Sequence, residues 1–95
     1  MTLKDLDYFV AIAQQGSITR AAAQLFVAQP ALSQCVQKLE KETGIELLVR
    51  NNTGVALTSE GRCFLEFAQR VLHEKAQLGK RIQDVENAEN GEIRL

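Results

Sequence analysis

Amide, hydroxyl and ammonium groups are concentrated on one side of the segment from residue 29 to residue 41. If this segment is a helix, the side away from its apolar positions carries Gln29, Ser33, Gln34, Gln37, Lys38 and Lys41. Amides and hydroxyls can pair with base edges in the major groove of DNA, and ammonium groups can bind phosphates. A polar helix face that only contacts water has the same composition, so the pattern alone leaves both interpretations open.

The elements that would hold this face in place are short helices with clear boundaries. Apolar residues recur at intervals of three and four in the first segment, at Leu3, Leu6, Val10 and Ala13. Gly16 can end that helix, and Ser17 can cap a second one. Pro30 suits the first turn of a third helix, which Gly44 can end. Two short helices, a three-residue connection and a third helix form the layout of a helix-turn-helix.

A hairpin and a long helix are expected after the third helix. Extended runs at Glu46–Arg50 and Val55–Leu57 flank a turn rich in Asn and Gly, and Thr58 can cap a helix over 59–88. At 1.5 Å per residue this helix is on the order of 45 Å long. Its apolar stripe consists of Phe64, Ala68, Val71, Leu78, Ile82 and Val85, with Lys75 in the same stripe. A 58-residue domain cannot cover so long a stripe, so we expect the helix to pair with a second copy.

The composition of the chain does not favour a nucleic-acid-binding protein. The 95 residues carry 11 Lys and Arg against 12 Asp and Glu, with a pI near 5.8, whereas nucleic-acid-binding domains are usually basic. The first 62 residues hold six acidic residues and six basic ones: Lys4, Arg20, Lys38, Lys41, Arg50 and Arg62. DNA binding must therefore depend on where the charges lie, because their number gives no net attraction.

Several classes are excluded by what the chain lacks. It has no apolar run of about 18 residues and no apolar leader, which predicts a cytoplasmic protein without a membrane span. Cys35 and Cys63 have neither zinc-site nor disulfide-scaffold spacing, and we expect both to pack as small apolar side chains. Catalytic triads, paired carboxylates and phosphate loops are also missing, so neither enzyme activity nor a cofactor in this fragment is expected.

Over residues 1–88 the chain resembles the DNA-binding domain of LysR-type transcriptional regulators. The motifs that carry this resemblance lie at 6–11, 16–22, 27–33, 39–40, 44–45 and 57–58, with Leu25, Leu47 and Gly61 between and after them. The resemblance implies a mainly α fold, a winged helix-turn-helix of three helices and a two-stranded wing over 1–58. An antiparallel dimerisation helix would follow over 59–88. Residues 89–95 would then be a hinge and the start of an effector-binding domain that this chain lacks, and a small-molecule inducer is expected for the full-length protein.

The resemblance and the polar face together give the candidate site residues. Base reading is assigned to Gln29, Pro30, Ser33 and Gln34. Contacts with the DNA backbone, including those of the wing, are assigned to Ser17, Thr19, Arg20, Gln37, Lys38, Arg50, Thr53 and Thr58. The chain departs from the family pattern at Ala28, where a capping Ser is common, and at Gln34 and Thr53, where Arg is frequent. Fewer cationic contacts predict weaker sequence-independent binding than a typical member shows.

We therefore expect a dimeric transcriptional regulator that binds a double-stranded DNA operator sequence-specifically. The third helix would enter the major groove, and the wing would contact the flanking backbone or minor groove. The full-length protein is expected to form a tetramer. The alternative is a helical protein-interaction module that dimerises without binding DNA, which the neutral charge and the coiled-coil-like helix favour.

Overall fold

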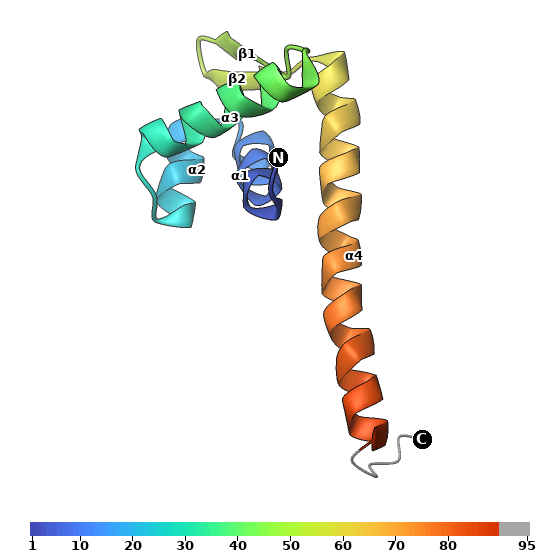
Figure 1. Cartoon of the computed structure of the whole chain (residues 1–95). Coiled ribbons are helices and arrows are strands. Elements are labelled where there is room, and N and C mark those ends of the chain that lie inside the picture. The colour runs from blue at the N-terminus through green and yellow to red at the C-terminus, as the bar shows by residue number, and fades with distance from the viewer. Residues whose placement is uncertain (90–95) are drawn as a thin grey trace.

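The computed structural model describes residues 1–89. Within them four helices and a two-stranded antiparallel sheet follow one another as α1 Leu3–Gln15, α2 Ile18–Leu25, α3 Gln29–Thr43, β1 Leu48–Asn51, β2 Gly54–Leu57 and α4 Ser59–Glu89. The first three helices and the hairpin form one lobe, and α4 projects from it as a long rod (Figure 1). This architecture confirms the predicted winged helix-turn-helix followed by a long helix.

The helices end where local chemistry predicts. Thr2 and Asp5 form a capping box at the start of α1, and the Ser17 hydroxyl accepts a hydrogen bond from the Arg20 N–H at the start of α2. Gly16 and Gly44 end α1 and α3 in the left-handed conformation, at φ 64° and 73°. At the start of α3, Ala28 provides no side-chain cap, as its methyl group dictates.

Two apolar clusters fix α3 against the rest of the lobe. In one cluster Phe9 of α1 meets Phe64 of α4 edge to face, with ring centroids 5.0 Å apart, and Leu39 of α3 is fully buried beside them. In the other, Ile12 of α1 packs with Leu32 of α3 and with the buried residues of α2. Because α3 is covered by α1 and α2 on its apolar side, its opposite side remains exposed.

The hairpin differs from the prediction at its first strand. Its register runs from Leu48 opposite Leu57 to Asn51 opposite Gly54, so the strand expected at Glu46–Arg50 begins two residues late. A side chain from α3 explains this: a Glu40 carboxylate oxygen accepts a hydrogen bond from the Leu47 N–H at 2.8 Å, so this N–H does not pair across the hairpin, although the Leu47 carbonyl still accepts from the Thr58 N–H at 3.0 Å.

The wing is also attached to the junction between α1 and α2. The Val55 N–H donates to the Gly16 carbonyl at 3.0 Å. A Cβ at Gly54 would overlap that same carbonyl, and Gly54 has φ 147°. Glycine is therefore required at this close approach, and the wing and the start of α2 are held side by side.

The long helix begins at a Thr58 cap and spans about 46 Å. Thr58 Oγ1 accepts from the Gly61 N–H at 2.8 Å. The first turns of α4 pack on α1, and the remainder extends beyond the lobe (Figure 1). Of the predicted hinge over 89–95, Glu89 is the last residue of α4, and 90–95 lie outside the described residues. None of the described helices is both long and apolar enough to span a membrane.

Candidate nucleic-acid interface

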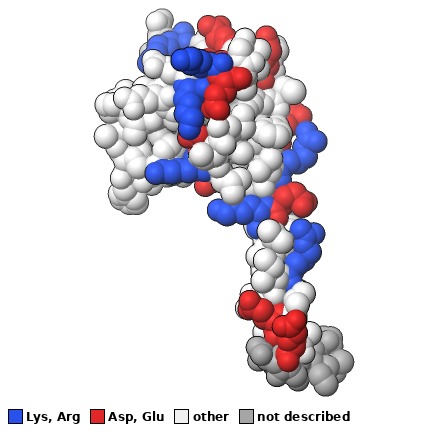
Figure 2. Space-filling model, viewed as in Figure 1, with Lys and Arg blue, Asp and Glu red and all other residues white. Residues whose placement is uncertain are grey.

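The start of α3 presents the residues predicted to read bases. Gln29, Pro30 and Gln34 are exposed, and Ser33 is half-buried, whereas Leu32 on the opposite side is fully buried. The first nine residues of α3 carry no charge. In Figure 2 the part of the lobe that contains the α2–α3 connection is correspondingly almost free of blue and red. The groups available here are amides, a hydroxyl and apolar atoms, which can recognise base edges but carry no positive charge to attract phosphate.

A shallow cleft joins this face to the wing. Its volume is about 170 Å³, and its lining consists of Ile18, Ser33, Val36, Gln37, Glu40, Leu48, Arg50 and Val55. The structure thus brings Ser33 and Gln37 of α3 to the same surface as Arg50 of β1. Sequence reasoning had placed these residues in one interface without showing which of them are neighbours.

The start of α2 and the tip of the wing provide the remaining predicted backbone contacts. Thr19 and Arg20 are exposed, while the Ser17 hydroxyl is engaged in capping α2. In the wing, Arg50 is exposed, and Thr53 donates both its N–H and its hydroxyl to Asn51 Oδ1, at 2.9 and 3.0 Å. Arg20 and Arg50 therefore carry exposed cationic groups, whereas the Thr53 hydroxyl proton is used inside the turn.

The Thr58 hydroxyl is used mainly in hydrogen bonds within the chain. Its hydroxyl donates to the Glu46 carbonyl at 2.6 Å and accepts from the Gly61 N–H. Both the proton and one lone pair are thereby used to start α4 and to close the wing. A DNA contact by Thr58 would have to use the remaining lone pair, which cannot bind a phosphate oxygen.

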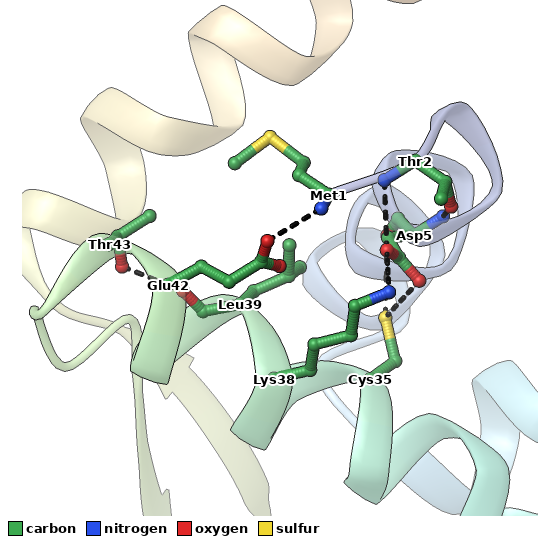
Figure 3. A network of polar contacts seen from close by, with 8 residues as sticks. All are labelled: Met1, Thr2, Asp5, Cys35, Lys38, Leu39, Glu42 and Thr43. Carbon is green, nitrogen blue, oxygen red and sulfur yellow. Dashed lines mark hydrogen bonds and ion pairs between the residues drawn. The ribbon is translucent and has the colours of Figure 1, made fainter.

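Lys38 has a partner within the chain, which sequence reasoning did not anticipate. Its ammonium lies 3.0 Å from Asp5 Oδ2 and joins α3 to the start of α1 (Figure 3). The hydrogen bond to Asp5 and the charge of that carboxylate raise the pKa of Lys38. Partial burial by itself raises the pKa of Asp5, but hydrogen bonds from Lys38 and Thr2 outweigh it, and the pKa is lowered overall.

The two cysteines differ in environment. Cys35 is buried as expected, and its thiol faces Asp5, at 3.5 Å from the carbonyl oxygen and 3.7 Å from Oδ1. Burial, and secondarily the negative charge of Asp5, raise the pKa of Cys35 to about 12. Cys63 was expected to pack, and this was wrong: it is exposed in the first turns of α4.

The predicted dimerisation stripe divides into two parts. Phe64 and Ala68 are buried within their own chain because the first turns of α4 cover α1, so neither can supply a dimer interface, and their assignment was wrong. Val71 is half-buried, and the stripe is exposed at Leu78, Ile82 and Val85. Phe67, which the prediction missed, is also exposed and lies on this side; its position three residues after Phe64 was the available signal.

Comparison with known proteins identifies the family. Residues 3–62 match the family model described as "bacterial regulatory helix-turn-helix protein, lysR family". The chain belongs to this family. The resemblance inferred from the motifs is thus confirmed, and LysR-family members are transcription regulators.

Relatives with assigned names are similar over most of this chain. The probable cat1 operon transcriptional activator of Acinetobacter lwoffii is 49% identical over 78 residues, which are 82% of this chain and 26% of that protein. The regulator ClcR of Pseudomonas putida is 38% identical over the whole chain, which covers 32% of ClcR. The chain therefore spans about a third or less of the length of these LysR-family relatives.

Solved structures of LysR-family DNA-binding domains match the fold closely. The DNA-binding domain of CbnR in complex with DNA has a TM-score of 0.86 and 38% identity, with 90% of this chain and 98% of that chain covered. The DNA-binding domain of BenM on the benA site 1 DNA has a TM-score of 0.85 and 40% identity, with 90% and 99% covered. Both similarities extend well beyond the helix-turn-helix, since 90% of this chain includes most of α4.

Proposed function

We propose that this chain is the DNA-binding part of a transcriptional regulator and binds a specific duplex sequence as a homodimer. The observation that carries the proposal is the likeness to the CbnR domain solved on DNA, which covers nearly all of that domain at 38% identity. The exposed, uncharged start of α3 supports placing this helix in the major groove. The helical interaction module without DNA binding is not favoured, because its only support was the neutral charge and the apolar stripe.

Base reading is proposed for Gln29, Pro30, Ser33 and Gln34. Gln29 is the first residue of α3, the end that a helix-turn-helix places nearest the bases. Its amide can pair with adenine N6 and N7 in bidentate fashion, which is worth about 1–3 kcal/mol of discrimination. Ser33 lies four residues later and therefore projects from the same side of the helix.

Backbone anchoring is proposed chiefly for Arg20 and Arg50, with the wing against the flanking backbone or minor groove. Both guanidinium groups are exposed, one at the start of α2 and one in β1. Because the wing is hydrogen-bonded to Gly16, these two elements form one continuous surface beside α3. The polar groups of Ser17, Thr19 and Gln37 are proposed to contribute neutral contacts, and Thr53 would do so only by releasing its hydroxyl proton from Asn51 Oδ1.

Dimerisation is proposed through the exposed part of the α4 stripe. For the whole protein we further propose a tetramer in the cytoplasm, with a C-terminal effector-binding domain that responds to a small-molecule inducer. The full-length CbnR and BenM structures, of which this chain covers less than a third, support a longer protein of this kind.

Enrichment of a random duplex library on this chain tests the proposal. The chain should select a sequence with two related half-sites, and binding to it should exceed binding to a scrambled duplex by at least a hundredfold at 150 mM salt. If no sequence is enriched and affinity depends only on salt, sequence-specific binding is refuted.

A further inference from the structure

The first cation along α3 is held away from the proposed DNA surface by an acidic residue of α1. Lys38 is the first charged residue of α3, and its ammonium contacts Asp5 Oδ2 at 3.0 Å. Figure 3 shows the lysine side chain reaching across from α3 to the carboxylate at the start of α1. The contact joins residues that lie 33 positions apart in the sequence.

The carboxylate that receives Lys38 also has other hydrogen-bond partners. Asp5 Oδ2 also accepts from the Thr2 N–H at 2.9 Å, within the capping box of α1. The Asp5 side chain is only 13% exposed, and the Cys35 thiol lies against its other oxygen. These partners hold the carboxylate in the orientation that accepts the ammonium, so it is a preorganised acceptor.

Helix geometry places Lys38 within reach of DNA if this contact is broken. At about 100° per residue, Lys38 is rotated by about 40° from Gln34 and stands one turn further along α3. Half of its side chain is exposed, and its four-carbon stem can swing the ammonium from α1 toward the groove side. A phosphate flanking the bases contacted by Gln34 would be its natural partner.

We propose that Asp5 limits sequence-independent DNA binding by competing with phosphate for the Lys38 ammonium. The inference rests on the proposed DNA-binding function. To contact the backbone, Lys38 must exchange a preorganised carboxylate for a phosphate, and the carboxylate left behind repels the same phosphate. The contribution of Lys38 to binding is therefore small in the unmodified chain, while the neutral base-reading groups are unaffected. Asp5 acts as a specificity-determining residue without contacting DNA.

The variant Asp5→Asn tests this inference, with Asp7→Asn as its control. Asparagine can still accept the Thr2 N–H, so the α1 cap is retained. Asp7 is an exposed residue of the same helix without an ion pair in the described chain, and its substitution changes the net charge equally. Asp5→Asn should strengthen random-duplex binding about three- to tenfold and steepen the plot of log affinity against log salt by about one unit. Operator binding should gain less, and Asp7→Asn should show neither effect.

A double variant separates the ion pair from the charge alone. In a Lys38→Gln background, Asp5→Asn should change neither affinity nor salt dependence. If Asp5→Asn has the same effect with and without Lys38, or the same effect as Asp7→Asn, the inference is overturned. The rate at which an amine-reactive ester modifies Lys38 provides a measurement without DNA; it should rise severalfold in Asp5→Asn, and an unchanged rate contradicts the competition. Unmodified chain that binds no duplex at all would overturn the proposed function itself, whereas normal binding with an unchanged salt slope would overturn only the role of Asp5.

Discussion

Replacing Leu78 by Glu should dissociate the proposed dimer, because Leu78 lies in the middle of the exposed α4 stripe. The side chain is 51% exposed in the isolated chain and stands between Val71 and Val85 on one side of the helix. Pairing with a second copy would remove about 90 Å² of its apolar surface from water, worth about 2 kcal/mol at about 25 cal/mol per Å². A two-fold symmetric dimer contains the substitution twice, so the loss is about 4–5 kcal/mol.

That loss corresponds to a dissociation constant raised about a thousandfold or more, since burial of the new carboxylate adds a further penalty. Sedimentation velocity between about 0.1 and 100 μM would follow the monomer–dimer equilibrium. Affinity for a duplex with two half-sites should fall steeply, while affinity for a single half-site should not change. Gln83→Glu, which adds the same charge on the opposite side of α4, is the matched control. If Leu78→Glu leaves the dimer intact, the exposed stripe is not the interface.

Four further outcomes test the site and the fold. Gln29→Ala should relax preference at one or two base pairs per half-site and leave random-duplex affinity unchanged; an equal loss on all duplexes would make Gln29 an anchor. Arg50→Ala should weaken specific and random duplexes alike and reduce the salt slope by about one unit, as titrations at several salt concentrations would show. Cys35→Ser should leave DNA affinity within a few-fold, and mild peroxide should not alter binding by the unmodified chain. The reason is that a thiol with a pKa of about 12 carries almost no thiolate at neutral pH. A peroxide-dependent loss of binding that the substitution abolishes would contradict this. Phe26→Asn should raise the free energy of unfolding by about 1 kcal/mol. Phe26 ends α2 in the left-handed conformation at φ 58° and is 95% exposed, so the substitution relieves backbone strain without loss of packing. A lower melting temperature would refute the strain argument.

Features that depend on residues close together in the sequence could be predicted. Gly16, Ser17 and Gly44 set helix boundaries through their own backbone or hydroxyl groups, and the structure places those boundaries as predicted. The start of β1 could not be predicted, because it depends on the Glu40 carboxylate from another element. The Asp5–Lys38 contact could not be predicted for the same reason, because no pattern in the sequence of α3 shows which residue of α1 lies beside it.

The α4 stripe illustrates a different limit. A helical period identifies which residues share a side of the helix, but it does not tell which partner covers them. One continuous stripe therefore predicted one interface, whereas Phe64 and Ala68 pack within the chain and only the later residues remain exposed. The dividing point is set by the position at which α4 passes the edge of α1, and this is a property of the tertiary fold.

The placement of the charges has a functional consequence that the net charge of −1 does not reveal. Lys38 is paired with Asp5, and the first nine residues of α3 have no charge, so the proposed reading surface has almost no cationic group of its own. Attraction to phosphate then depends on Arg20 and Arg50 at its margins. Binding to random DNA comes almost entirely from such contacts, whereas discrimination among sequences comes from base edges. A surface with uncharged base-contacting groups at its centre and few phosphate-binding groups at its rim has a lower affinity for all DNA. It retains the difference in affinity between one sequence and another.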